Sequence, residues 1–438
     1  MLPQGWVETQ LEASCHSINY GCTSTSDAKR GDIRYIRITD IQDNDVEWDN
    51  VPYLVKIPKD IGKYELNKGD LVFARTGATV GKSYLFDDLP YRSVFASYLI
   101  RVRCNEKFLC PTYAKWFFRS PQYWKQIYDG AEGTGQPNFN GTKLAHLVVP
   151  LPPLAEQRRI VAKLNSLTTR IARARAELER ARKNAEHIRI ATLGKAFHWN
   201  ETDLPHGWNR KTVGEIGDVQ LGRQRSPKDH VGPHMRPYVR SANITWDGWD
   251  FSDVKEMNFS PAEFKTFRLQ SGDVLLNEGS GSPSEVGKPA IWNDEIKNAC
   301  FQNTVLRVRS DAFYPELLRY ALLFLARTGA FIRNTQGVNI IHIGKAGLSR
   351  TCIPVPPISE QPKILKEIQA DFDASNRLQH EADRCLTLLN RLESSLLAKA
   401  FRGELVPQDP NDEPASVLLD RIRAERAAVP KPGRKRKA

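Results

Sequence analysis

The chain has 438 residues, of which 40% are hydrophobic, and it carries a formal net charge of +12. This positive charge favours a polyanionic partner, either nucleic acid or an acidic surface. The seven cysteines include no Cys-x-x-Cys pair, which argues against a disulfide framework and a zinc ribbon and in favour of reduced thiols.

No run of apolar residues reaches the length that a transmembrane helix needs. The start of the chain, MLPQGWVETQLEASC, also lacks the basic and apolar regions of a secretory signal. We therefore expect a cytoplasmic protein without a membrane partner.

Residues 1–153 alternate short strand-like runs with turn residues. Runs such as 33–41 and 98–103 are rich in β-branched and aromatic residues and are separated by Gly, Asp and Asn. Near the end of this segment Pro111 opens a helical stretch that we expect to continue as one helix to Tyr128. The pattern predicts a domain of mixed α and β structure, here called the first domain.

A proline-rich corner, PLPPLAEQ at 150–157, leads from this domain into a long helix. Its prolines force an extended entry, because a residue before proline is pushed out of the helical region. Glu156 falls in the first turn, where a carboxylate suits the helix dipole. Apolar or small residues then recur at alternating steps of four and three, which predicts a helix with a heptad seam over 154–200.

The same plan returns after an offset of about 204 residues, so the chain is a duplication of one unit. We expect a second mixed domain over 201–357, here called the second domain, and a second long helix over 358–403. The matching stretches are LPQGW (2–6) with LPHGW (204–208), GDLVF (69–73) with GDVLL (272–276), VGK (80–82) with VGK (286–288), and the corner with PVPPISEQ (354–361).

The two helices carry apolar stripes in the same register, and each stripe needs a partner, so we expect the helices to pair with each other. The second stripe is less regular, and we expect Asp371, which interrupts it, to lie near Arg182 or Arg189 of the first helix. The expected seam consists of Ile160, Leu164, Leu167, Ile171, Leu178 and Ile188 in the first helix and Ile364, Ile368, Leu378, Leu389 and Leu392 in the second.

The predicted fold class is therefore α+β. Two mixed α/β domains are joined by two long helices that form an antiparallel coiled coil, and the whole has an internal pseudo-twofold repeat. A C-terminal extension over 404–438 ends in the basic tail PKPGRKRKA.

These repeated motifs resemble those of the specificity, or DNA-recognition, subunits of type I restriction-modification systems. The resemblance covers nearly the whole chain and is carried by the two corners with their helices, by GDLVFARTGATVGKS at 69–83 and by AKAFRGELVPQDPNDEPAS at 398–416. It implies two target-recognition domains, each of which reads one half of a bipartite, asymmetric site in double-stranded DNA. It also implies that the paired helices set the gap and dock two methyltransferase (modification) subunits.

By the same resemblance, this chain has no catalytic centre and binds no cofactor. The methyltransferase subunits are expected to bring S-adenosylmethionine and to methylate adenine, and restriction (motor) subunits are expected to use ATP and Mg²⁺. The residues agree with this division, since the chain lacks the usual signatures of an amino-methyltransferase, namely Asn-Pro-Pro-aromatic, Asp-Pro-Pro-Tyr and Gly-x-Gly-x-x-Gly. We expect no metal site either, because the Val-Gly-Pro between His230 and His234 breaks the helix on which paired ligands would lie.

The segment GATVGKS at 77–83 looks like a phosphate loop, but it has three residues between its glycines where a Walker A motif has four. Two alternatives remain. The loop offers Lys82, or Lys288 in the second copy, to a DNA phosphate, or it is a plain turn between strands.

Candidate DNA contacts follow from side-chain chemistry, since Arg suits guanine edges and phosphates while Asn and Gln suit adenine edges. The alternative for each Asn and Gln is a turn-forming side chain. The candidates are Arg75, Lys82, Gln136, Asn138 and Asn140 in the first domain, and Arg223, Arg225, Arg240, Asn243, Lys288, Gln336 and Asn339 in the second.

A different class of function also fits the composition. The chain would then be a non-catalytic coiled-coil adaptor that displays two protein-binding domains. Salt separates the two classes, because a DNA reader loses affinity steeply as the salt concentration rises.

Overall fold

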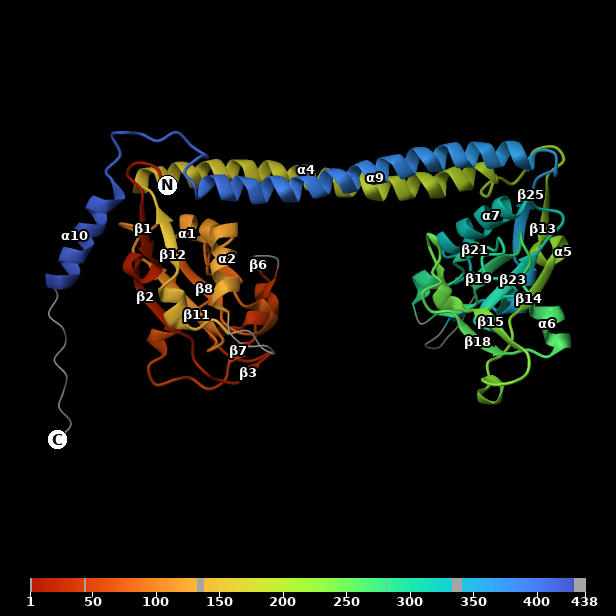
Figure 1. Ribbon diagram of the computed structural model, residues 1–438, viewed down its shortest axis with the longest axis horizontal. Helices are drawn as coiled ribbons and strands as arrows, with labels where there is room; N and C mark the ends of the chain where they lie inside the picture. The colour runs from red at the N-terminus through yellow and green to blue at the C-terminus, as the bar shows by residue number, and fades with distance from the viewer. Residues whose placement is uncertain (1, 43–44, 132–137, 281, 333–340, 429–438) are drawn as a thin grey trace. The chain divides into compact units, whose positions relative to one another are not determined.

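The computed structural model describes the chain except for residues 1, 43–44, 132–137, 281, 333–340 and 429–438 (Figure 1). The chain divides into two compact units. The first consists of Met1–Glu177 with Cys385–Ala438, and the second of Leu178–Arg384. Each unit therefore contains one domain and half of each long helix.

The first domain is built on an antiparallel four-stranded sheet in the order β2-β11-β8-β9. A smaller sheet has the order β10-β4-β7-β3, and β1 pairs with β12. The strands are β1 (Val7–Gln10), β2 (Cys15–Tyr20), β3 (Ser26–Asp27), β4 (Arg34–Ile36), β7 (Tyr53–Leu54), β8 (Asp70–Ala74), β9 (Ser83–Leu85), β10 (Ser93–Phe95), β11 (Leu99–Cys104) and β12 (Val148–Leu151).

Three short helices complete the first domain: α1 (Pro111–Phe117), α2 (Pro121–Gly130) and α3 (Gly141–Ala145). The prediction of one continuous helix after Pro111 was wrong, because the chain breaks between α1 and α2. Proline cannot continue the hydrogen-bond ladder, and the Ser120 side chain caps the new helix by accepting a hydrogen bond from the Tyr123 N–H (3.2 Å).

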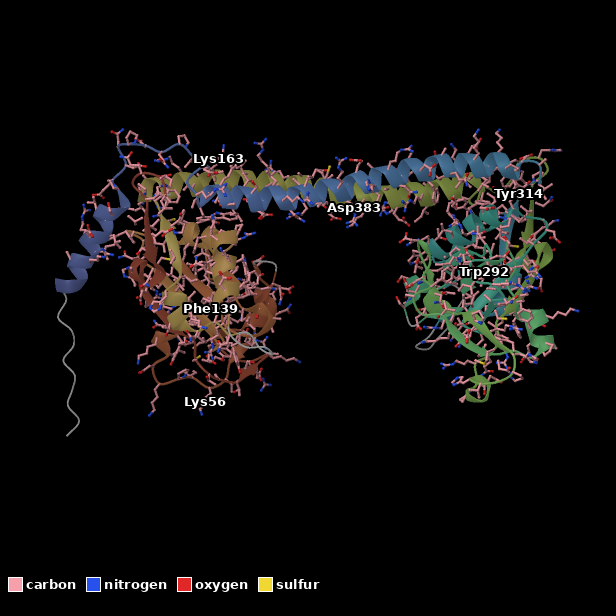
Figure 2. The ribbon with its side chains drawn as sticks, in the orientation of Figure 1. Lys56, Phe139, Lys163, Trp292, Tyr314 and Asp383 are labelled. Atoms are coloured by element: carbon pink, nitrogen blue, oxygen red, sulfur yellow. The ribbon has the colours of Figure 1, made fainter. Side chains whose placement is uncertain are left out.

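The second domain repeats this plan with a sheet in the order β14-β23-β19-β21, so the predicted internal repeat is confirmed. Its helix α7 (Pro315–Arg327) is unbroken. Phe139 in the first domain and Trp292 in the second are buried in the cores (Figure 2). The strands are β13 (Asn209–Thr212), β14 (Asp218–Leu221), β15 (Met235–Val239), β18 (Lys255–Asn258), β19 (Val274–Asn277), β20 (Gly279–Ser280), β21 (Pro289–Ile291), β22 (Cys300–Phe301), β23 (Val305–Arg309), β24 (Ile341–His342) and β25 (Cys352–Val355).

The repeat extends to backbone geometry in the Val-Gly-Lys loops. Gly81 and Gly287 have φ values of +90° and +78°, a region that favours glycine. A Cβ atom at Gly81 would lie 2.6 Å from Trp124, and one at Gly287 would lie 2.6 Å from Phe331. Both loops therefore require glycine for the same two reasons.

The repeated Glu-Gln pair holds each domain to its long helix. Gln157 is fully buried, and its side chain accepts from the Cys110 N–H (2.9 Å) and donates to the carbonyls of Phe108 (2.8 Å) and Pro152 (3.1 Å). Glu156 accepts a hydrogen bond from the indole of Trp6 at 3.0 Å, and burial raises the pKa of this carboxyl.

The second corner uses the same contacts. Gln361 accepts from the Tyr314 N–H (2.8 Å) and donates to the carbonyls of Ala312 (3.0 Å) and Pro356 (3.2 Å). The Trp208 indole donates to Glu360 at 3.1 Å. The two corners are repeated because each one is a hydrogen-bonded joint as well as an extended entry into a helix.

The long helices α4 (Leu154–Ala196) and α9 (Gln361–Ala400) pack antiparallel. Within the first unit, Arg175 of α4 donates to Asn390 (2.7 Å) and pairs with Glu393 of α9 (3.4 Å). Within the second unit, the buried Ser375 hydroxyl of α9 donates to the Ala185 carbonyl of α4 (2.7 Å). Polar contacts thus accompany the apolar ones.

The expected seam needs a correction at three positions, because Ile188, Leu378 and Leu392 are exposed. An α-helix falls about 20° short of a strict seven-residue repeat in every heptad, so the buried stripe moves to later residues. The next residue along therefore faces the other helix, as Gln379 does when it accepts from Arg189 (3.0 Å). Of the remaining seam residues, Leu167, Leu178 and Leu389 are half-buried, and Ile160, Leu164, Ile171, Ile364 and Ile368 are buried.

The expected ion pair of Asp371 is also corrected. Asp371 accepts a hydrogen bond from the Thr192 hydroxyl at 3.1 Å. Arg182 pairs with Asp383 at 2.9 Å, and Arg189 pairs with Glu186 of its own helix. The shift of the buried stripe places these arginines beside other partners.

Part of the C-terminal extension belongs to the core of the first unit. Helix α10 (Ala415–Ala428) buries Leu419 and Ile422 in this core. The Ala415 N–H donates to the Gly5 carbonyl (3.0 Å). Arg159 of α4 pairs with Asp412 just before α10 (2.6 Å). The extension therefore closes the first unit near its N-terminal strand.

Replacing Gln361 with Ala should destabilise the second unit. The substitution removes three hydrogen bonds and leaves buried backbone groups without partners, and we expect a loss of about 2–4 kcal/mol in the free energy of unfolding. Urea unfolding followed by tryptophan fluorescence measures this. Gln369→Ala, at an exposed position of the same helix, is the matched control, and equal stability of the two variants would contradict the role of the joint.

Candidate nucleic-acid interface

Arg75 lies at the end of a central strand of the first domain. It directly follows β8, and its guanidinium carbon stands 5.0 Å from the ring centre of Tyr20 on β2, within reach of a cation–π attraction. Its Nε atom is buried without a hydrogen-bond partner, and no carboxylate pairs with it among the residues that the structure describes. The charge is held by an aromatic ring and is available to a polar or anionic ligand.

The amides expected near Arg75 behave differently from one another. Asn138 is exposed and pairs with Thr76, the residue after Arg75, in an isolated antiparallel bridge. Asn140 caps α3, since its side-chain oxygen accepts from a backbone N–H of that helix (2.9 Å). The turn-forming alternative therefore describes Asn140, while Asn138 remains a candidate contact. Gln136 lies outside the described residues.

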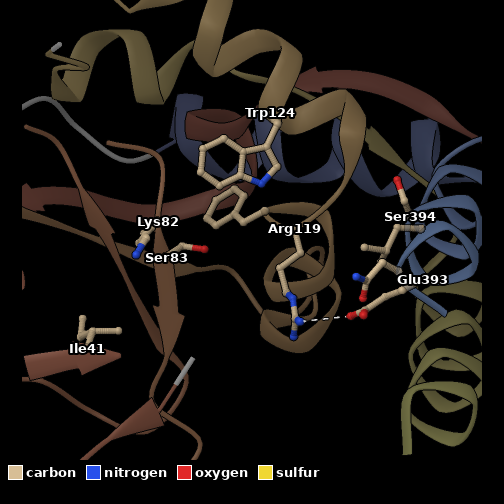
Figure 3. Close-up of a pocket in the computed structure, with 10 residues that line it drawn as sticks. Ile41, Lys82, Ser83, Arg119, Trp124, Glu393 and Ser394 are labelled. Atoms are coloured by element: carbon tan, nitrogen blue, oxygen red, sulfur yellow. Dashed lines mark hydrogen bonds and ion pairs between the residues drawn. The ribbon is translucent and has the colours of Figure 1, made fainter. Parts of the chain in front are cut away.

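Lys82 lies in a turn that joins β8 to β9. Its carbonyl accepts from the Ala74 N–H (2.8 Å), and its side chain is exposed. It lines an open cavity of about 430 Å³ together with Trp124, Arg119 and Glu393, and the last two form an ion pair of 3.4 Å (Figure 3). The segment is thus a strand-joining turn, and a phosphate contact by Lys82 stays a prediction.

Arg225 and Arg240 come together in the second domain. With Lys255 they line a cavity of about 370 Å³. Asp253 pairs with Arg240 and with Lys255, each at 2.5 Å, and the hydrogen bond from Lys255 is the main cause that lowers the pKa of Asp253. Three cations line this pocket and one carboxylate pairs with two of them, so the pocket stays basic, which suits a phosphate oxygen.

Two other cations of the second domain are already neutralised inside it, which corrects the expected phosphate contacts. The Arg223 side chain is 12% exposed and pairs with Asp229 (3.0 Å) and Glu263 (2.7 Å). Lys288 is 8% exposed and donates to Glu285 at 2.5 Å, which lowers the pKa of that carboxyl. Both side chains serve the domain's own packing.

Asn243 is corrected for a similar reason. It is buried, its side-chain oxygen accepts from the Arg240 N–H (3.0 Å), and its amide nitrogen donates to the Asp250 carbonyl (2.9 Å). The turn-forming alternative therefore describes this residue. Gln336 and Asn339 lie outside the described residues.

Tyr20 and Lys255 take part in these two surfaces without any signal in the sequence. Tyr20 ends an ordinary strand, and only the order β2-β11-β8 brings it to Arg75. Lys255 begins β18, and the pairing of β18 with β15 places it beside the residues that follow β15. Sheet topology, which cannot be read from local patterns, creates both contacts.

Other classes of site find no support in the part of the chain that the structure describes. No group of three or more His, Cys, Asp or Glu side chains there is arranged to hold a metal ion. His230 accepts a hydrogen bond from Arg225 (3.1 Å). None of the described helices is long and apolar enough to cross a membrane.

Comparison with solved structures supports this architecture. The chain is similar to a structure described as the basis of complex assembly and conformational transition of the type I R-M system, with a TM-score of 0.72, 24% identity, and coverage of 92% of this chain and 100% of that chain. It is also similar to the HsdS subunit of Thermoanaerobacter tengcongensis, with a TM-score of 0.56, 23% identity, and coverage of 92% and 98%. At these identities the likeness establishes the fold.

Comparison with characterised sequences establishes the family. Residues 3–181 and 205–384 each match the type I restriction modification DNA specificity domain. The EcoKI specificity subunit of Escherichia coli K12 is 26% identical to this chain, with coverage of 98% of this chain and 97% of that protein. The StySPI specificity subunit of Salmonella potsdam is 25% identical, with coverage of 97% and 96%. The chain therefore belongs to the family of type I restriction-modification specificity subunits and is the non-catalytic DNA specificity subunit of such a system.

Proposed function

We propose that each domain reads one half of a bipartite, asymmetric site in double-stranded DNA. The observation that carries this proposal is that one scaffold occurs twice with different side chains on it: Arg75 over Tyr20 in the first domain, and the pocket of Arg225, Arg240 and Lys255 in the second. Family membership favours DNA over protein as the ligand of both surfaces. The proposed parts of the chain are the two recognition domains (1–153 and 201–357), the two spacer helices (154–200 and 358–403) and the C-terminal extension (404–438).

Within this proposal, the candidate side chains have different tasks. Arg75 and Asn138 suit base edges, whereas Lys82, Arg225 and Arg240 suit phosphates. Gln136, Gln336 and Asn339 are further candidates on chemical grounds. Lys82 remains in this set because its side chain is exposed, unlike that of Lys288.

The paired helices are the proposed spacer and docking site for two methyltransferase subunits. Ile188 and Leu392 lie 204 residues apart at equivalent positions, and they are 46% and 47% exposed. Leu388 is exposed one turn before Leu392. We take Ile188 and Leu392 as the docking candidates because equivalent positions of a duplicated unit would contact equivalent partners, one on each helix.

The chemistry is assigned to the other subunits. The methyltransferase subunits would bind S-adenosylmethionine and methylate adenine, and restriction (motor) subunits would use ATP and Mg²⁺. This chain would select the DNA for both activities and would bind none of these cofactors. As the DNA-reading subunit of such a complex, the chain is proposed to work in the cytoplasm.

Sequencing of methylated adenines tests the reading function. Cells that express this chain together with its methyltransferase subunit should show one bipartite motif with two different halves and a constant gap. Cells that lack only this chain should show no such motif. A single continuous motif, or a motif that persists without the chain, would contradict the proposal.

Charged substitutions on the helices test the docking site. Leu392→Asp should remove one methyltransferase subunit from the complex, Ile188→Asp should remove the other, and the double variant should bind none. The reason is that a desolvated carboxylate in an apolar interface costs several kcal/mol. Light scattering coupled to size-exclusion chromatography reads the stoichiometry.

Val417→Asp is the matched control, because Val417 is an exposed apolar residue on α10, outside the two long helices. It should leave two methyltransferase subunits bound. If both helix variants also keep two bound subunits, the docking surface lies elsewhere.

A further inference from the structure

The backbone has the same hydrogen bonds at Arg75 and at Glu278. Each residue directly follows the corresponding central strand, β8 or β19. Each is hydrogen-bonded to two corresponding segments of its own domain, one just before β11 or β23 and one farther along the chain. The matching hydrogen bonds run from Arg75 N to Tyr98 O (3.2 Å) and from Glu278 N to Thr304 O (2.9 Å), and from Phe139 N to Arg75 O (2.9 Å) and from Ile343 N to Glu278 O (2.8 Å).

A second pair of positions is equivalent in the same way. Asn138 lies opposite Thr76 in an isolated bridge, and His342 lies opposite Gly279 where β24 pairs with β20. Each therefore lies beside the residue that follows Arg75 or Glu278. The two domains present a pair of side chains at matching points of matching backbones.

The chemistry at these points differs between the domains. The first domain offers a guanidinium and an amide. The second offers the Glu278 carboxylate, whose Oε2 lies 2.6 Å from Nδ1 of His342, and the Glu278 and His342 side chains are 14% and 55% exposed. Tyr20, which supports Arg75, has Leu221 as its counterpart in the strand register of the second sheet. A donor-rich surface in one domain thus corresponds to an acceptor and an imidazole in the other.

We propose that these positions decide which bases each domain accepts: Arg75 with Asn138 in the first domain and Glu278 with His342 in the second. The proposal rests on the proposed function and assigns residues to it. An arginine fork donates to O6 and N7 of guanine, and a carboxylate accepts from the exocyclic N4 amine of cytosine. The half-site of the first domain should contain a guanine read by Arg75, and that of the second domain a cytosine read by Glu278.

The test compares the adenine-methylation motif of the complex with the wild-type chain and with Glu278→Gln or Arg75→Gln. Each substitution should lower methylation of the original site by roughly 10- to 100-fold and relax one base position in one half only. The gap and the other half should stay unchanged. Arg75→Lys, which keeps the charge but loses the fork, should relax the same position as Arg75→Gln with a smaller loss of overall DNA affinity.

Asp311→Asn and Lys107→Gln are the matched controls. Both residues are exposed and follow the C-terminal ends of β23 and β11, whereas Arg75 and Glu278 lie at the N-terminal ends of these strands. Their substitution should leave the motif unchanged. Thermal unfolding and methyltransferase binding establish that each variant is folded. An unchanged motif in folded Glu278→Gln and Arg75→Gln overturns this assignment, as does a change in both halves at once. Absence of a bipartite motif with the wild-type chain would instead overturn the proposed function.

Discussion

One buried glutamine in each copy joins a recognition domain to its long helix. The corner that carries it contains consecutive prolines, which have no N–H group to donate, so nearby backbone groups need a side-chain partner. The glutamine amide donates and accepts at once, and it reaches the corner and the segment before α1 or α7 together. The neighbouring glutamate fixes the tryptophan from the start of the domain. Without this joint, the fixed relation between reading surface and helix within each unit would be lost.

A fixed joint leaves the outer surface free to vary. The strand order, the glycine in the Val-Gly-Lys loop and the backbone hydrogen bonds at Arg75 and Glu278 are the same in both copies. The side chains at the matching positions differ in charge: Arg75 and Asn138 stand in the first domain, and Glu278 and His342 in the second. Duplication of one scaffold with independent surfaces is what a protein needs in order to combine two unrelated half-sites. The helices also leave Ile188 and Leu392 exposed, and these are the positions that we propose for partner docking.

Local patterns in the sequence were enough to predict the repeat, the corners and both long helices, because proline geometry, glycine turns and apolar periodicity act over a few residues. The helix break at Pro121 also had a local signal, because Ser120 and Pro121 form a typical helix start, and the prediction of one continuous helix did not use it. The seam failed because a strict heptad was extended over a helix of ordinary pitch. Arg223 pairs with Glu263 forty residues away, which no local pattern encodes, whereas Lys288 pairs with Glu285 only three residues before it.

The most direct test of two independent readers on one scaffold is to duplicate one of them. Residues 3–153 would be replaced by residues 205–357, and methylated adenines would be sequenced in cells that also express the methyltransferase subunit. Because the helices are antiparallel, we expect a motif whose halves are inverted copies of the second domain's half-site, with the original gap. Persistence of the first half-site, or an asymmetric motif from an assembled complex, would contradict it.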